Sequence, residues 1–392
     1  MINVTRLLCG IGQPMDHLRY GEGNGAPRSA AERKPVVVWN VTRTCNLNCL
    51  HCYSDSHARA YEGELTHDEG RALLEDLASF GVPAVLFSGG EPLARRDLFE
   101  LAEYGRTLGL KMTLSTNGTL IDRKRAQRIR NIGFSYVGIS IDGIGSVNDL
   151  FRGKAGAFKR AVAGISHCKA VGQKVGLRLT LTPHNADNLD AIFDFIEYHK
   201  IERACFYHLV PAGRGRGETA LSPDESRRSV QTIFRRTRYL VAKGDPREIL
   251  TVDNHADAPF LYMTLLREDP VAAKVAYKAL AWNGGGRYSS GVGIADIDPQ
   301  GNVHPDQFWQ SAALGNVRLR KFSEIWTDPE NHLLAALRDR LPRLKGRCGA
   351  CRFQNLCGGN FRVRALAATG DMWAPDPGCY LTDDEVLVAQ TA

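Results

Sequence analysis

The sequence has no long hydrophobic run, and this absence limits where the protein can work. None of its 392 residues lies in a stretch that approaches the roughly 20 apolar residues needed to cross a bilayer. The first ten residues include Leu7, Leu8 and Cys9 but lack the apolar core of a signal peptide. We therefore expect a cytoplasmic protein with no membrane partner.

The sequence also lacks a strong excess of either charge. It has 50 Lys and Arg against 43 Asp and Glu, a formal net charge of +7. Basic clusters at 124–130 and 338–347 have no aromatic residues interleaved in the way that nucleic-acid platforms require. We expect no nucleic-acid partner, and an anionic small substrate would suit the charge.

Cysteine is the informative residue that is present. A disulfide framework is not expected in a long chain without a signal peptide, and clustered thiols there favour metal binding. Three of the ten cysteines, Cys9, Cys168 and Cys205, stand alone and are expected to be small core residues. The other seven form two groups: Cys45, Cys49 and Cys52, and then Cys348, Cys351, Cys357 and Cys379.

Six apolar, β-branched runs alternate with segments of helical periodicity. This alternation predicts an α/β fold, with a parallel sheet whose helices lie outside. Six units rather than eight predict a partial (βα)6 barrel of the TIM type, open on one side, and a doubly wound sheet is the alternative. The strand runs are 36–42, 84–88, 111–116, 136–141, 175–182 and 204–210, and the helical segments are 66–80, 95–108, 122–131, 154–171 and 187–199.

The rest of the chain divides less clearly. Residues 1–34 are expected to form an irregular N-terminal arm, and residues 35–215 the barrel. Residues 216–300 are read as a connecting segment with a helix at 223–243. A hairpin is expected at 293–304, and residues 301–392 form a smaller domain that carries the second cysteine group.

The first cysteine group is a C-x3-C-x2-C run directly after the first strand. Soft thiolates at this spacing select zinc or an iron–sulfur cluster. Structural zinc takes four protein ligands, and His51 would be an awkward fourth because it lies between two close ones. Three thiolates on a cluster of four irons would leave one iron open for a cofactor. The loop falls at the carboxyl end of its strand, where the active sites of such barrels form.

This run, followed by Tyr53, resembles the signature of the radical S-adenosylmethionine (SAM) superfamily. Four further motifs have the order and the strands that this family uses. They are Gly89-Gly90-Glu91-Pro92, Ser115-Thr116-Asn117-Gly118, Ser140-Ile141-Asp142-Gly143 with Arg152, and Leu209-Val210-Pro211. The resemblance covers about residues 35–215 and implies SAM bound beside a redox-active [4Fe–4S] cluster.

The resemblance also implies roles for single residues. The Glu91 carboxylate would pair with the methionine ammonium of SAM, and Ser140 and Arg152 would hold its carboxylate. The full set of expected SAM contacts is Tyr53, Gly89, Gly90, Glu91, Ser115, Asn117, Ser140, Asp142, Arg152 and Leu209.

The second cysteine group resembles the SPASM extension of radical SAM enzymes, whose cysteines bind auxiliary [4Fe–4S] clusters. Structural zinc is the alternative. A full extension has seven cysteines, but here Phe361 and Asp306 occupy two of the expected positions, and none occurs at 206–347. The resemblance therefore implies one auxiliary cluster and two [4Fe–4S] clusters in all. Four thiolates would leave that cluster no open iron, which suits electron transfer or scaffolding.

Residues 301–309 and 357–362 resemble the branch of this family that acts on tetrapyrroles, and within it the enzymes of haem d1 biosynthesis. This implies an iron tetrapyrrole substrate, didecarboxysirohaem, from which propionate side chains are removed after hydrogen abstraction. A low-potential electron donor is then needed. The alternatives are other side-chain changes (acetate removal or propionate-to-vinyl conversion), a SPASM-type peptide maturase, and a non-enzymatic cluster protein.

A macrocycle with several carboxylates favours an arginine-rich mouth with aromatic walls. Candidate substrate residues are Arg214 and Arg216 after the sixth strand, with a flexible surface loop as the alternative. His255 and His304 are further candidates, with a hydrogen-bonded structural role as the alternative. Candidate catalytic residues are Tyr207, His208 and Asp306. Because strand side chains alternate, only one of Tyr207 and His208 is expected to face the barrel interior. Asp306, at the position of a lost cluster ligand, is expected to line a cavity for the substrate.

Overall fold

The alternating runs form one sheet of eleven strands in the computed structural model, which describes residues 1–13, 16–21, 33–218 and 220–387. Its centre contains the six predicted strands, each parallel to the one before it. They are β2 (Val36–Asn40), β3 (Val85–Ser88), β4 (Met112–Thr116), β5 (Tyr136–Ser140), β6 (Val175–Leu181) and β7 (Arg203–His208).

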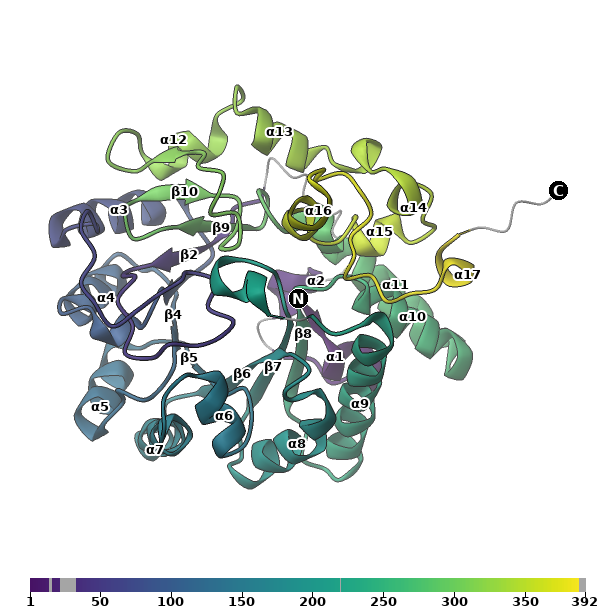
Figure 1. The fold of residues 1–392 in the computed structure, drawn as a ribbon, viewed down its shortest axis with the longest axis horizontal. Coiled ribbons are helices and arrows are strands. Elements are labelled where there is room, and N and C mark those ends of the chain that lie inside the picture. Colours follow the sequence, from purple (N-terminus) through teal and green to yellow (C-terminus); the bar gives the residue numbers. More distant parts are fainter. Residues whose placement is uncertain (14–15, 22–32, 219, 388–392) are drawn as a thin grey trace.

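The strands lie side by side in chain order, with no reversal. A doubly wound sheet requires such a reversal, so that alternative is wrong and the barrel-type order is confirmed. Figure 1 shows the strands as an inner layer with the helices around the outside. The connecting helices are α3 (His67–Phe80), α4 (Leu98–Thr107), α5 (Arg123–Ile132), α6 (Ser146–Phe151), α7 (Ala157–Ala170) and α8 (Leu189–Tyr198).

Local sequence signals set the ends of these helices. Thr66 and Glu69 form a capping box at the start of α3, and the Asp122 side chain accepts from the Arg125 amide at the start of α5. Both helices end at a glycine, Gly81 or Gly133, whose backbone is left-handed. A β-branched residue would be sterically strained in that conformation. The hydrophobic core lies between this outer layer and the sheet, as in the stacked pair Phe193 and Phe206, whose ring centroids are 5.2 Å apart.

The barrel is longer than predicted at its carboxyl-terminal side. The helix expected at 223–243 is α9 (Pro223–Ala242). The strand β8 (Glu248–Val252), which was not predicted, follows α9 and pairs in parallel with β7. The predicted irregular arm also needs correction, because β1 (Ile2–Asn3) pairs antiparallel with β8 and continues into α1 (Val4–Cys9). A short helix, α2 (His17–Tyr20), comes next. Positions 14–15 and 22–32 of the predicted arm lie outside the described residues.

The other edge of the sheet is built from the predicted hairpin. β9 (Ile294–Ile297) pairs in parallel with β2, and β10 (Asn302–His304) returns antiparallel to β9 and pairs with β11 (Gly315–Asn316). The hairpin is therefore confirmed. The boundary expected between residues 300 and 301 falls inside it, so the chain does not divide into two domains at that point.

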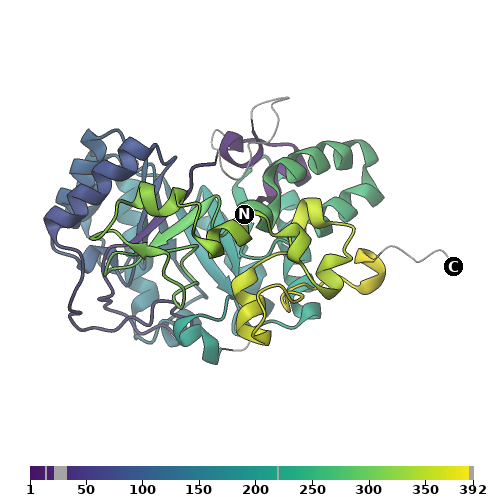
Figure 2. The ribbon, with the colours of Figure 1, turned by 90° about the horizontal axis from the view of Figure 1, so that it is seen from above.

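The C-terminal segment packs against the end of the barrel. Val210, just after β7, shares a small buried core with Trp309, Leu337 and Phe361. Figure 2 shows this segment, in yellow, at the end of the molecule away from the blue helices α3 and α4.

None of the helices in the described ranges is long and apolar enough to cross a membrane. The remaining helices are α10 (Asp257–Glu268), α11 (Pro270–Asn283), α12 (Phe322–Thr327), α13 (His332–Arg338), α14 (Gly346–Gly349), α15 (Gln354–Cys357), α16 (Arg362–Thr369) and α17 (Asp383–Val386).

Candidate active site

The carboxyl ends of the parallel strands open into a cavity of about 1110 Å³, part of which is open solvent. This is the end of the barrel at which the sequence places the site. The fold therefore brings most of the predicted residues into one wall, although their contact with SAM stays a prediction. The predicted residues that line the cavity are Cys45, Cys49, Cys52, Tyr53, Gly89, Gly90, Ser115, Asn117, Ser140, Arg152, Tyr207, His208, Leu209 and Arg214.

The three thiols of the first group are suited to holding a cationic cluster. Burial raises the pKa of the Cys45 thiol to about 12, so this group would stay protonated without a nearby cation. The Leu47 amide lies 3.4 Å from Cys45 Sγ, and the Arg152 guanidinium lies 3.6 Å from Cys49 Sγ. Such N–H donors are what thiolate ligands of a metal cluster normally receive.

The two glycines of the Gly89-Gly90 motif let two loops meet. A Cβ at Gly89 would lie 2.3 Å from the Thr42 carbonyl oxygen, and one at Gly90 would lie 2.4 Å from that of Thr44. The Gly90 amide donates to the Thr42 carbonyl at 2.8 Å. The glycines therefore permit close backbone approach, as the sequence suggests, and the segment that they approach is the loop carrying the cysteines.

Glu91 is held by hydrogen bonds from within the protein. Its carboxylate is fully buried, is not part of the cavity wall, and accepts from Thr116 Oγ1 at 2.7 Å and the Asn117 amide at 2.8 Å. It also accepts from the Leu93 amide, in the short helix η2 (Pro92–Ala94). Burial raises the pKa of this carboxyl. These bonds join the second predicted motif to the third, and the contact of Glu91 with the methionine ammonium stays a prediction.

Asp142 also lies behind the wall. It forms a buried ion pair with Arg152, and its Oδ2 is 3.7 Å from His51 Nε2. The His51 ring stacks on Phe151, and burial lowers the pKa of His51 to about 4. Asp142 therefore orients two side chains that face the cavity. The structure places Ser140 and Arg152 in the wall, as the motif predicts.

The glycine–arginine segment after β7 is a short helix, η4 (Gly213–Gly217), and not an open mouth. Arg214 Nε donates to the Cys49 carbonyl at 3.0 Å, and its Nη1 forms an ion pair with Asp55 at 2.8 Å. Arg214 thus binds the cysteine loop from the far side of the barrel. Arg216 is exposed and does not line the cavity, so its predicted role in substrate binding is not supported.

Tyr207 and His208 both line the cavity, contrary to the expectation from strand alternation. His208 is the last residue of β7, so the alternation ends with it. His208 Nε2 lies 3.1 Å from Asp257 Oδ2, and Asp257 Oδ1 accepts from Tyr380 Oη at 2.7 Å. His208 is thereby held in one orientation by a buried carboxylate.

The other three candidates lie outside the cavity wall. The Asp306 carboxylate is turned towards Ser290 Oγ and the Phe308 amide, so Phe308 reaches the cavity in its place. His304 is held by the Ala312 carbonyl at 2.9 Å within the hairpin region. His255 is buried against Phe361, with ring centroids 5.5 Å apart. The predicted contacts of these residues with substrate are therefore not supported.

Sequence reasoning missed two charged residues in the wall, Arg178 and Asp253. A lone arginine within the apolar run of β6 was a usable signal for the first. Asp253 follows β8, a strand that the sequence analysis did not predict. Asp253 has a left-handed backbone (φ 65°), and burial raises the pKa of its carboxyl to about 6. Such backbone strain is typical of functional sites.

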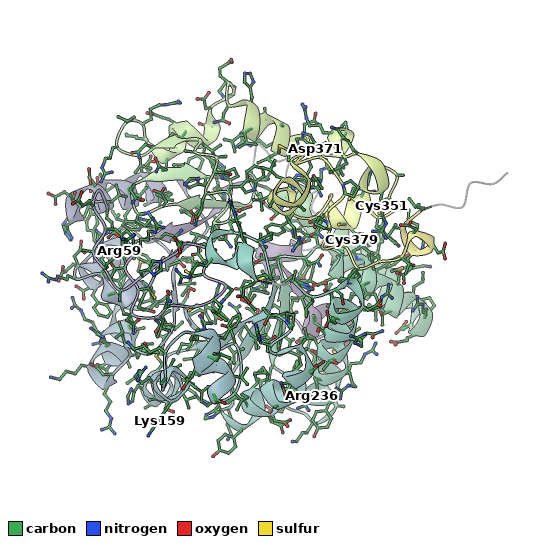
Figure 3. All side chains as sticks on the ribbon, viewed as in Figure 1. Arg59, Lys159, Arg236, Cys351, Asp371 and Cys379 are labelled. Carbon is green, nitrogen blue, oxygen red and sulfur yellow. The ribbon has the colours of Figure 1, made fainter. Side chains whose placement is uncertain are left out.

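The second cysteine group also comes together. Cys348, Cys351, Cys357 and Cys379 all line a space of about 410 Å³, and Arg347 Nη1 lies 3.2 Å from Cys379 Sγ. Figure 3 labels Cys351 and Cys379 in the C-terminal segment, away from Lys159 and Arg236 on the outer helices. In the described part of the chain, no three His, Cys, Asp or Glu side chains are arranged around a single ion.

Comparison with known proteins identifies the class. The family model described as the radical SAM superfamily matches residues 39–196. The chain is also 50% identical to a curated member of the tetrapyrrole branch over 98% of its length. The chain belongs to the radical SAM superfamily and is a radical SAM enzyme. Membership implies SAM and a [4Fe–4S] cluster as cofactors, and the buried thiols with their N–H donors suit that cluster.

Two relatives and one solved structure are informative. The first relative is the Fe-coproporphyrin III synthase of Methanosarcina barkeri, 50% identical, with 98% of this chain and 99% of the relative covered. The pre-haem d1 synthase of Dinoroseobacter shibae is 48% identical, with 91% and 88% covered. Streptococcus suis SuiB bound to S-adenosylmethionine has a TM-score of 0.71 at 18% identity, covering 89% and 78%, and this likeness concerns the fold alone.

Proposed function

We propose that this enzyme removes carboxylate-bearing side chains from an iron tetrapyrrole, with didecarboxysirohaem as the substrate. The observation that carries the proposal is the pair of relatives at 50% and 48% identity, both named for tetrapyrrole products and both matched over most of this chain. The residues of the cavity wall supply a physical rationale.

The wall combines aromatic rings with positive charge. Tyr53, Tyr207 and Phe308 offer flat apolar surfaces for a macrocycle, and Arg178 lies beside the Tyr207 ring. The cavity, about 1110 Å³ with part of it open solvent, extends from the cysteine group to Tyr207 and Phe308.

The cysteine side of the cavity is the proposed SAM site. Cys45, Cys49 and Cys52 would hold the cluster, with Arg152 and Ser140 facing the carboxylate of SAM. A bound, reduced cluster would supply the electron that cleaves SAM into methionine and a 5′-deoxyadenosyl radical able to take a hydrogen atom from a substrate carbon. Asp142 holds Arg152 in place, and the Arg214 clamp fixes the cysteine loop.

Two products are compatible with this reaction class. The haem d1 hypothesis from the sequence predicts loss of propionate groups. The Methanosarcina barkeri relative, matched over 99% of its own length, is named for Fe-coproporphyrin III. This macrocycle keeps four propionates, so acetate removal is the second candidate reaction. The proposal includes an auxiliary [4Fe–4S] cluster on the second cysteine group and a low-potential electron donor.

The test is an anaerobic turnover of the reconstituted enzyme with SAM, a strong reductant and didecarboxysirohaem. Chromatography measures 5′-deoxyadenosine, and mass spectrometry measures the macrocycle. We expect 5′-deoxyadenosine to rise with substrate and the macrocycle to lose side-chain carbon. Loss of propionate carbons supports the haem d1 reaction, and loss of acetate carbons supports the coproporphyrin reaction. An unchanged macrocycle alongside SAM cleavage would refute the substrate assignment and favour a peptide substrate.

A further inference from the structure

Three arginines line the cavity, and they differ in their partners. Arg152 forms an ion pair with Asp142, and Arg214 forms one with Asp55. The guanidinium of Arg178 has neither an ion pair nor a hydrogen bond with any residue that the structure describes, and the Tyr207 ring lies against it, at 4.5 Å. One cation in the wall is therefore left for a ligand.

The fold holds Arg178 in this position. Along β6, Leu177, Leu179 and Leu181 are buried in the core, whereas Arg178 and Thr180 line the cavity. The stem of Arg178 crosses the neighbouring strand at Gly138, where an added Cβ would lie 2.7 Å from Arg178 Cδ. Glycine on β5 thus leaves room for the arginine, and the guanidinium is stacked on Tyr207 rather than free to move.

Asp253 acts on Arg178 only from beyond ion-pair distance, and an enclosed cation that forms no ion pair is costly unless a ligand supplies one. The planar guanidinium fork matches a carboxylate in two parallel hydrogen bonds. We infer that Arg178 binds a carboxylate of the substrate and orients the side chain that reacts. The inference rests on the proposed function, because it takes a carboxylate-bearing macrocycle as the substrate.

The register of the sheet indicates where the substrate carboxylate at Arg178 would lie. Arg178 is paired with Ser140 of β5, which is predicted to contact SAM, so a group bound at Arg178 lies beside the SAM site. Asp253 lines the same cavity, and its carboxyl group has no hydrogen-bond partner among the described residues. A second substrate carboxylate would be repelled there, so the two side chains together restrict how a polycarboxylate can bind.

The experiment compares Arg178→Gln and Arg178→Lys with wild type and with Arg130→Gln, which removes an exposed arginine of α5 far from the wall. All proteins are reconstituted with iron and sulfide. Iron content and circular dichroism check that each one folds. The Kd for ferric didecarboxysirohaem is measured from the Soret band, and the Kd for SAM by equilibrium dialysis.

We expect Arg178→Gln to weaken tetrapyrrole binding about 10- to 100-fold, as loss of a charged hydrogen bond predicts. Arg178→Lys should lose less, and Arg130→Gln should match wild type. The Kd for SAM should stay the same in all four proteins. A fully esterified macrocycle has no carboxylate for Arg178, so wild type and Arg178→Gln should bind it equally.

Two results separate the inference from the proposed function. If wild type binds the tetrapyrrole and Arg178→Gln binds it equally well, or loses affinity for SAM instead, the inference is wrong and the proposed function stands. If wild type does not bind the tetrapyrrole, the proposed function is refuted, and the inference fails with it.

Discussion

The buried carboxylate of Asp142 forms an ion pair with Arg152, and the same guanidinium lies 3.6 Å from the sulfur of Cys49. Asp142 and Arg152 are both predicted to contact SAM, and Asp142 therefore holds Arg152 in place. Asp142 is fully buried and Arg152 is nearly so, which means that neither charge can turn to solvent if its partner is lost.

Asp142→Asn should release Arg152 from its orientation. Removing one partner of a buried ion pair typically costs about 3–5 kcal/mol of stability. We expect a lower Tm and weaker SAM binding, measured by thermal unfolding and by anaerobic equilibrium dialysis. Asp122→Asn is the matched control, because asparagine caps α5 as well as aspartate does. An unaltered Tm and SAM affinity in Asp142→Asn would contradict the role assigned to this pair.

Glu91→Gln tests the link between two motifs. Thr116 Oγ1 and the Asn117 amide donate to different oxygens of Glu91, and glutamine keeps one acceptor oxygen, so the amide nitrogen costs the protein one of these two hydrogen bonds. A buried donor left without an acceptor costs about 1–3 kcal/mol, so the free energy of unfolding should fall by that amount. Chemical denaturation measures it. The control is Glu103→Gln, on the exposed face of α4, which should be neutral.

The two cysteine groups should hold metal independently. Replacing Cys45, Cys49 and Cys52 by alanine should remove about half of the bound iron and abolish SAM cleavage, whereas replacing Cys348, Cys351, Cys357 and Cys379 should remove the other half. Iron and zinc analysis with electron paramagnetic resonance distinguishes these outcomes. One zinc per chain that disappears with the second group would show a structural zinc site there instead.

Asp306 should make stability depend on pH. Burial is the main cause that raises the pKa of its carboxyl to about 6, so the folded state binds a proton more tightly than the unfolded state. This stabilising contribution is present below the unfolded pKa near 4 and is lost as the pH rises through 6. Between pH 5 and 8, Asp306→Asn should gain about 1–2 kcal/mol relative to wild type. Urea titrations at each pH measure the difference, and parallel curves would contradict it.

Much of the barrel could be predicted because the sequence patterns that specify its helices and its cysteine loop are local. Thr66 and Asp122 cap their own helices, and the C-x3-C-x2-C run stands directly after an apolar strand. In-register pairing of six such strands then brings their carboxyl ends to one edge of the sheet. Order along the chain was therefore enough to place the cysteines, Ser140 and Leu209 around one cavity.

Other features depend on contacts between distant segments, which no local pattern encodes. β1 has only two residues and forms because β8, some 250 positions later, offers an unpaired edge. Glu91 matches its family motif in sequence, yet packing directs its carboxylate to Thr116 and Asn117 rather than to the cavity. His304 and Asp306 are turned inwards in the same way.

By itself, the sequence determined the family, the order of the strands and the two sets of thiols, because spacing and periodicity carry that information. Only the tertiary structure decided which charges are satisfied. Asp142 meets Arg152 at the two ends of one helix, Asp55 reaches Arg214 from a distant loop, and Gly138 gives Arg178 its space without an ion-pair partner. A charge is neutralised by what lies near it in space, and that neighbourhood exists only after the sheet has closed around the cavity.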